Sequence, residues 1–242
     1  MSLRPSASSG DSSRRHGAGR RSLLRRRLLA SRLMVLVGGA GSVAETVAVA
    51  KTVLEGGAPV IQLRLKAMPR DRVLAAARAL LPLCEARGAL LIVNDDAFTA
   101  AAAGAHGVHG GQEDPPPEAL RSVLGPHGLV GLSVHNAAEA RVAAAGVQHL
   151  DYVGVGTVFP SPTKPELSPC GLGVLTETTQ HLAGVPAYAI GGVTAENLAL
   201  CLHNGAHGVA VASAVTATPD PAATTRQFLA QISRFLGEGG SV

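Results

Sequence analysis

Aromatic residues, cysteine and charge are all scarce in this chain of 242 residues. Phe, Tyr and Trp together make up 2%, with no Trp, which argues against a surface that stacks nucleic-acid bases. The three cysteines, at positions 84, 170 and 201, form no CxxC pair, so we expect reduced thiols in a cytoplasmic protein. The nine histidines include no HExxH spacing, and no apolar run approaches the ~18 residues of a membrane helix. With 46% hydrophobic and 16% charged residues, the chain is predicted to fold.

The net charge of +4 comes from one end of the chain. Residues 1–32 hold nine arginines and a single acid, a balance of +8, so the remaining 210 residues balance at −4. We expect 1–32 to be a disordered Arg/Ser-rich extension, or an over-long start, that is dispensable for folding. A transit peptide and a secretory leader are the alternatives for this segment. The acidic body argues against nucleic acid as a partner.

From position 33 onward, short continuous apolar runs alternate with Ala-rich segments of helical period. Continuous apolar strands are typical of parallel sheets covered on both faces. Eight such pairs predict one (β/α)₈ TIM barrel over 33–242, with an open doubly wound sheet as the alternative. The repeated GAHGV at 104–108 and 205–209 favours the barrel, and Asn136 and Thr194 are expected helix N-caps. The predicted strands are 33–37, 60–65, 90–94, 106–109, 129–132, 152–156, 187–190 and 208–212, and the predicted helices are 42–55, 70–87, 96–103, 115–124, 136–145, 172–182, 194–203 and 220–236.

Polar residues gather where these strands end, which is the face that carries the active site in TIM barrels. Arg64, Lys66 and Lys164 can converge as cations there. Asp95 and Asp114 end adjacent strands, and Mg²⁺ typically takes one or two carboxylates with water and substrate phosphates. The pattern favours a Mg²⁺–pyrophosphate site. The alternatives are an Arg64–Asp95 surface ion pair and a helix cap at Asp114.

Two loops predict a second anionic site. Gly191-Gly192 and Ala212-Ser213 follow the last two strands, where barrels often hold one phosphate on backbone N–H groups. A plain turn is the alternative for the glycine pair. Two anionic sites at one barrel mouth imply two phosphorylated substrates.

Taken in order, several segments resemble the thiamine-phosphate synthase family. They are QLRLK (62–66), VND (93–95), GVHGGQED (107–114), GLSVH (131–135), DYVGVGTVFPSPTK (151–164), PCGL (169–172), AIGGV (189–193) and GVAVASAV (208–215). The resemblance implies a transferase of thiamine biosynthesis that joins a hydroxymethylpyrimidine diphosphate to a thiazole phosphate and releases pyrophosphate. It also implies Mg²⁺ as cofactor. Family departures include Gly110 in place of Leu and Asp96 in place of Arg.

The resemblance also implies a role for each matching residue. The catalytic cations would be Arg64, Lys66 and Lys164, and the metal ligands would be Asp95 and Asp114. The pyrimidine diphosphate would be held by Gln62, Arg64, Lys66, Asn94, Ser133 and Lys164. The thiazole phosphate would be held by Ser161, Thr163, Gly192, Ala212 and Ser213.

Two other functions fit the same fold. One is a thiazole tautomerase, which would not need the two carboxylates or the Lys66/Lys164 pair. The other is a non-catalytic barrel that binds thiazole phosphate or thiamine phosphate, since a fold does not fix function. No general base is required at the attacking thiazole nitrogen, and His135 is expected to be a structural loop residue. A homo-oligomer is compatible with the sequence.

Overall fold

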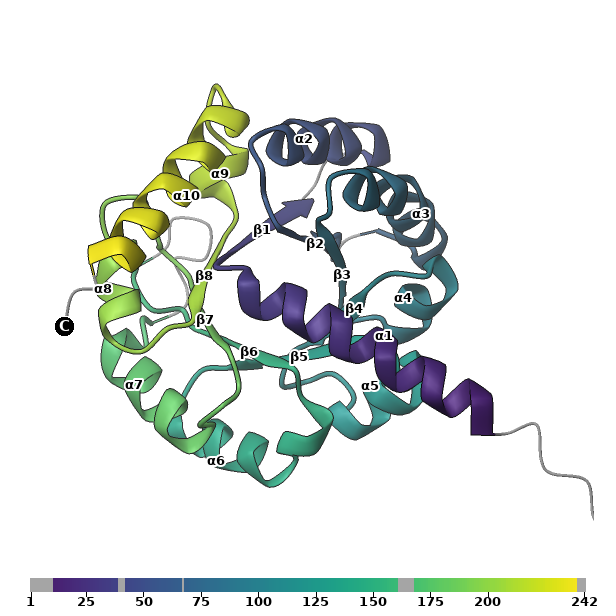
Figure 1. Ribbon diagram of the computed structural model, residues 1–242. Coiled ribbons are helices and arrows are strands. Elements are labelled where there is room, and N and C mark those ends of the chain that lie inside the picture. The colour runs from purple at the N-terminus through teal and green to yellow at the C-terminus, as the bar shows by residue number, and fades with distance from the viewer. Residues whose placement is uncertain (1–10, 39–41, 67, 161–167, 239–242) are drawn as a thin grey trace, which may run out of the picture.

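Eight parallel strands close into a barrel in the computed structural model, which describes residues 11–38, 42–66, 68–160 and 168–238, with side chains from 19 to 237 within those ranges. The strands pair in chain order and β8 returns to β1, so the TIM barrel is confirmed and the open sheet is excluded (Figure 1). The strands are β1 (Leu33–Gly38), β2 (Val60–Arg64), β3 (Leu90–Asn94), β4 (Gly107–Gly110), β5 (Leu129–Val134), β6 (Tyr152–Val155), β7 (Ala187–Ile190) and β8 (Gly208–Val211).

Helices follow the strands and form the outer ring (Figure 1). Most predicted helices are confirmed to within one or two residues. The helix predicted over 194–203 begins at Leu198 instead. Thr194 is not its cap, because the Thr194 N–H donates to Asn197 Oδ1. Asn136 caps its helix as predicted, accepting the Glu139 N–H. The helices are α1 (Asp11–Ala30), α2 (Val43–Glu55), α3 (Arg70–Ala86), α4 (Ala97–Ala103), α5 (Pro117–Leu124), α6 (Ala137–Ala145), η1 (Val147–His149), α7 (Gly171–His181), α8 (Leu198–His203), α9 (Ser213–Thr216) and α10 (Pro221–Glu238).

Alternation along each strand separates two cores. On β1, Met34 and Leu36 belong to a cluster inside the barrel, whereas Val35 and Val37 pack outward with the helices. Because side chains of a strand alternate between faces, residues two apart share the barrel interior. Residues that pair in register on neighbouring strands point to the same face, so the same alternation of inward and outward side chains continues from strand to strand. This alternation decides which polar residues face the mouth of the barrel.

The N-terminal segment is the main correction to the sequence-based expectation. Residues 11–30 form α1, which lies across the amino ends of the strands, so this part of the segment is not a disordered extension (Figure 1). Leu24 and Leu28 are buried in the interior cluster, and the Tyr188 hydroxyl donates to the Leu28 carbonyl at 3.1 Å. The leucines stand four residues apart, on one face of the helix, and so close the base of the barrel.

Arginines of α1 also anchor it. Asp151, directly before β6, is fully buried and lies 3.0 Å from Arg21 and 3.4 Å from Arg25. Arg121 of α5 reaches the other carboxylate oxygen at 2.5 Å. The composition of the segment predicted disorder because it does not reveal that its arginines pair with a buried acid far along the chain. None of the helices in the ranges described is long and apolar enough to cross a bilayer.

Candidate active site

One cavity of about 770 Å³ opens at the carboxyl ends of the strands. Its size is typical of small-molecule sites. Ten of the thirteen predicted site residues line it: Gln62, Arg64, Lys66, Asn94, Asp95, Asp114, Ser133, Gly192, Ala212 and Ser213. The other three, Ser161, Thr163 and Lys164, lie outside the residues that the structure describes.

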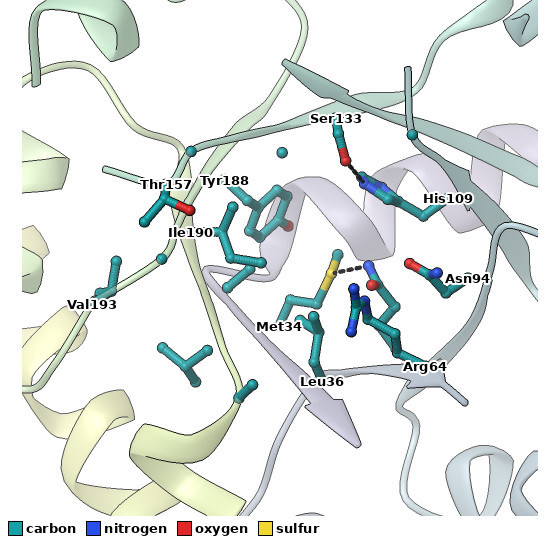
Figure 2. Close-up of a pocket in the computed structure, with 18 of the residues that line it drawn as sticks. Met34, Leu36, Arg64, Asn94, His109, Ser133, Thr157, Tyr188, Ile190 and Val193 are labelled. Carbon is teal, nitrogen blue, oxygen red and sulfur yellow. Dashed lines mark hydrogen bonds between the residues drawn. The ribbon is translucent and has the colours of Figure 1, made fainter. Parts of the chain in front are cut away.

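The alternation of inward-facing and outward-facing residues along each strand explains why side chains far apart in sequence meet in this cavity. Gln62 and Arg64 are two apart on β2, and Asn94 pairs in register with His109 of β4. The side chains of Arg64, Asn94, His109 and Ser133 of β5 point into the barrel mouth (Figure 2), and Gln62 lines the same cavity. Gln62 is almost fully buried at the floor, where its Nε2 donates to the Met34 sulfur at 3.3 Å.

The cationic and acidic groups meet on one side of the mouth. Lys66 Nζ lies 3.7 Å from Asp95 Oδ2, so the ion partner of Asp95 is Lys66 and not Arg64, which acts on it from further away. The Asp114 carboxylate lies close enough to Asp95 to raise the pKa of its carboxyl group. The expected approach of the two carboxylates is therefore present, and the Arg64–Asp95 ion-pair alternative is wrong.

The environment of Asp95 resists its negative charge. Burial raises the pKa of Asp95 to about 6, and the neighbouring Asp114 carboxylate adds to the rise, while Lys66 and Arg64 oppose it. Asp95 also has a positive φ of 67°, unusual for a residue with a side chain. Two carboxylates held together in this way repel each other unless a proton or a cation lies between them.

The other predicted role of Asp114 is also wrong. Asp114 does not cap α5, which begins at Pro117 after Pro116. Its Oδ2 instead accepts the N–H of Gly111 at 2.7 Å, which holds the carboxylate at the cavity wall beside Asp95.

Asp96, the family departure beside this pair, faces another way. It caps α4 by accepting the Thr99 N–H, and its two oxygens accept from Arg70 at 2.6 and 3.1 Å. These hydrogen bonds hold the pKa of Asp96 below its usual range against the effect of burial. Its charge is thus matched locally rather than directed at the cavity.

The glycine pair after β7 lies against the loop after β6. Gly191 and Gly192 have φ of 91° and 64°. A Cβ on Gly192 would lie 2.4 Å from the Pro160 carbonyl oxygen, so only glycine allows this approach. The Asn197 amide fixes the turn by donating to the Gly192 carbonyl at 2.9 Å. Ala212-Ser213 lies beside it across the β7–β8 pairing and lines the same cavity.

Comparison with known proteins agrees with this arrangement. Residues 33–215 match the family model described as thiamine monophosphate synthase. The chain belongs to the thiamine monophosphate synthase family. A thiamine-phosphate synthase of Thioalkalivibrio sulfidiphilus is 44% identical over 75% of this chain and 85% of that protein. One from Thermosynechococcus vestitus is 42% identical over 77% of this chain, which spans 52% of that longer protein.

Solved structures extend the likeness of this thiamine monophosphate synthase family member to three dimensions. A thiamine phosphate pyrophosphorylase from Pyrococcus furiosus superposes with a TM-score of 0.76 at 30% identity, covering 88% of this chain and 99% of that one. A 3-hexulose-6-phosphate synthase from Salmonella typhimurium gives 0.67 at 14% identity and therefore shows the fold alone.

The cavity of this family member also contains residues to which sequence reasoning gave no role. His109, Tyr152 and Tyr188 all line it, and the rings of both tyrosines are fully buried inside the barrel. Tyr152 and Tyr188 sit within apolar strand segments, whereas His109 ends one, and the pattern of residue types gave none of the three a function. The one signal in the sequence is their spacing: each stands two positions before a residue that lines the cavity, and residues two apart on a strand face the same side. His135, expected to be structural, is exposed and lies 2.9 Å from Glu139.

Proposed function

We propose that the protein condenses 4-amino-2-methyl-5-(diphosphooxymethyl)pyrimidine with 4-methyl-5-(2-phosphooxyethyl)thiazole, as an alkyl- or aryl-transferase that releases thiamine phosphate and pyrophosphate. The observation that carries the proposal is the mouth itself. A carboxylate pair with two cations lies on one side, and two small-residue loops lie on the other. Family membership supports the same reaction.

The pyrimidine diphosphate fits the side of the mouth formed by β2 to β5. Gln62, Asn94 and Ser133 offer amide and hydroxyl groups to the ring, which the apolar floor at Met34 and Leu36 encloses. Arg64 and Lys66 would bind the diphosphate, together with Lys164. Converging cations favour the departure of a leaving group on which negative charge develops.

The residues present fit a magnesium ion. Asp95 and Asp114 supply two carboxylates, and the residues described contain no cluster of three or more His, Cys, Asp and Glu that would suggest a closed metal cage. This is the donor set that Mg²⁺ uses when it completes its shell with water and phosphate oxygens. When bound, the ion would neutralise charge on the departing pyrophosphate.

The thiazole phosphate fits the other side. The backbone at Gly192 and at Ala212-Ser213 would hold its phosphate, with Ser161 and Thr163 as the remaining proposed contacts. Loops after the last two barrel strands often serve this purpose.

The chemistry asks little of the side chains beyond binding. The aminopyrimidine can carry positive charge at its exocyclic methylene as the bond to pyrophosphate breaks. Arg64, Lys66 and Lys164 would stabilise the leaving oxygen, and the thiazole nitrogen attacks the methylene without losing a proton. The pairing of His135 with Glu139 is consistent with the absence of a general base at that nitrogen.

The deciding assay measures pyrophosphate release from the purified protein with both substrates and Mg²⁺. Release that requires both substrates supports the proposal. Tautomerisation of a thiazole phosphate without the pyrimidine would instead identify a tautomerase, and binding without turnover would identify a binding protein.

The three free thiols support a cytoplasmic location.

The two halves of the mouth can then be separated. Ser213→Asp places a like charge near the thiazole phosphate and should raise its KM, while the KM of the pyrimidine diphosphate changes little. Equal losses for both substrates would contradict this division of the mouth.

A further inference from the structure

Two ion pairs join the β2–α3 connection, which carries Lys66 and leads into Arg70, to the β3–α4 connection, which carries Asp95 and Asp96. Lys66 Nζ lies 3.7 Å from Asp95 Oδ2, and both residues line the large cavity. Arg70 Nε donates to Asp96 Oδ2 at 2.6 Å, and its Nη2 donates to Oδ1 at 3.1 Å. Neither Arg70 nor Asp96 belongs to the lining of the large cavity. The second ion pair therefore stands beside the site without facing a ligand in it.

The guanidinium of Arg70 is held on two sides by residues that follow β3. Its two parallel hydrogen bonds with the Asp96 carboxylate have the geometry of the strongest arginine–carboxylate pairs. Its Cζ also lies 5.5 Å from the centre of the Phe98 ring, a cation–π contact. Phe98 is 61% exposed at the start of α4, so burial in the core does not fix this ring. Asp96 and Phe98 together set the direction of one arginine.

Asp96 is itself well anchored. Its Oδ1 accepts the Thr99 N–H at 3.1 Å, and its Oδ2 accepts the Thr99 hydroxyl at 2.6 Å. The preceding residue, Asp95, has the positive φ of 67°, which persists only where the surrounding contacts hold the backbone. Because Asp96 adjoins Asp95 in the chain, contacts that fix Asp96 also limit where the Asp95 carboxylate can point.

Packing gives the Lys66 side of this contact little support. A second cavity, of about 170 Å³, lies between the two connections, and Lys66, Arg70, Asp95 and Asp96 all line it. The Lys66 side chain is 58% exposed, so water competes for its ammonium group. A void beside a long exposed side chain provides no atoms to pack against it. The Arg70–Asp96 pair bridges the two connections beside this void.

We propose that Arg70 is a positioning residue: its pair with Asp96 clamps the β2–α3 connection to the β3–α4 connection and so keeps Lys66 beside Asp95, where a magnesium-bound diphosphate would meet both. The inference rests on the proposed function for the identity of that ligand. Arg70 acts through Lys66 and Asp95 and does not touch the substrate. Asp96, which departs from the family pattern, is the acidic half of the clamp.

Calorimetric titration of the purified protein with magnesium pyrophosphate tests the clamp without requiring turnover. R70M removes the guanidinium and keeps an unbranched side chain. It should weaken binding roughly tenfold, the lower end of what is lost when groups that orient metal ligands are removed. Because an exposed ion pair adds little to stability, the melting temperature should change by no more than about 4 °C. A lower melting temperature with unchanged affinity would show a merely structural role and overturn the proposal.

D96N separates the clamp from simple attraction between charges. Asn caps a helix as well as Asp does, so the cap of α4 remains, but the amide nitrogen cannot accept from Arg70. The clamp predicts that D96N weakens binding, as R70M does. The double variant should bind within about twofold of R70M, because the effects of direct partners are not additive.

The sign of the D96N effect is decisive. If Arg70 acted only as a distant positive charge, D96N would tighten the binding of magnesium pyrophosphate by removing a negative charge nearby. Tighter binding in D96N overturns the clamp, and so do fully additive losses in the double variant.

Arg87 provides the matched control. It follows the other end of α3, at the base of the barrel, and lies 4.0 Å from Glu55. R87M removes a partly exposed arginine from an ion pair next to the same helix, so it should leave the affinity for magnesium pyrophosphate unchanged. A loss in R87M equal to that in R70M would overturn the proposal.

Turnover separates this inference from the proposed function. In R70M the KM of the pyrimidine diphosphate should rise roughly tenfold, while the KM of the thiazole phosphate stays unchanged. If the wild type binds magnesium pyrophosphate but releases none from the two substrates, the proposed function fails and the affinities of the variants still decide the clamp. If the wild type does not bind magnesium pyrophosphate, the clamp has no ligand to position and the inference is overturned.

Discussion

The contact between α1 and the base of the barrel can be tested with Leu28→Ala. Leu28 is 1% exposed and packs in the interior cluster beside Tyr188. Truncating a buried leucine typically costs 2–5 kcal/mol, from lost burial and from the cavity left behind. A central value of about 3 kcal/mol lowers the melting temperature of a domain of this size by roughly 6–12 °C.

The neighbouring residue supplies the control. Leu29 is on the same helix and is 45% exposed. Leu29→Ala deletes the same side-chain atoms at an exposed position, so it should change the free energy of unfolding by less than about 0.5 kcal/mol. Thermal unfolding of both variants, followed by circular dichroism, measures the difference. Equal melting temperatures would refute the packing of α1 on the barrel.

Deleting residues 1–30 should then cost more than Leu28→Ala. The deletion uncovers the leucine site, removes Arg21 and Arg25 from the buried Asp151, and takes away one carbonyl acceptor of Tyr188. The expectation that this segment is dispensable would be restored only if the truncated protein melted at the wild-type temperature.

The remaining predictions concern the mouth and pH. Asp95→Asn and Asp114→Asn should each reduce turnover by roughly 10²–10³-fold, measured across a Mg²⁺ titration. The melting temperature should stay level or rise, because each substitution relieves repulsion between the two carboxylates. Wild-type turnover in both variants would contradict their proposed role as metal ligands. Gly192→Ala should raise the KM of the thiazole phosphate and lower stability by about 1–3 kcal/mol, whereas Gly88→Ala, at φ 65° with open space around it, should leave KM unchanged. The pKa of His106 is lowered from 6.5 to about 4 on folding. Its contribution to the free energy of unfolding is therefore present above pH 6.5 and is lost as the pH falls towards 4. His106→Gln should reduce the change in the free energy of unfolding over this range by about 3 kcal/mol, and an unchanged pH dependence would show that another group titrates.

Much of the candidate site could be predicted because it is local in the sequence. The residues at 62–66, 93–95 and 107–114 directly end or follow apolar strands, so strand order alone placed them at one face. Partners could not be predicted in the same way. Whether Asp95 meets Lys66 or Arg64, and whether Asp114 caps a helix or accepts from Gly111, depends on side-chain directions that a pattern of residue types does not contain.

The sequence by itself determined the barrel, because eight alternations of continuous apolar strands and Ala-rich helices leave few ways to bury both faces of a parallel sheet. Tertiary structure alone decided what lies inside it. His109 and Tyr152 became a hydrogen-bonded pair because glycines on two adjacent strands leave the space, and α1 became part of the fold because Asp151 and an apolar opening lie beneath it. Both outcomes depend on contacts between residues far apart in the chain, which form only when the barrel closes.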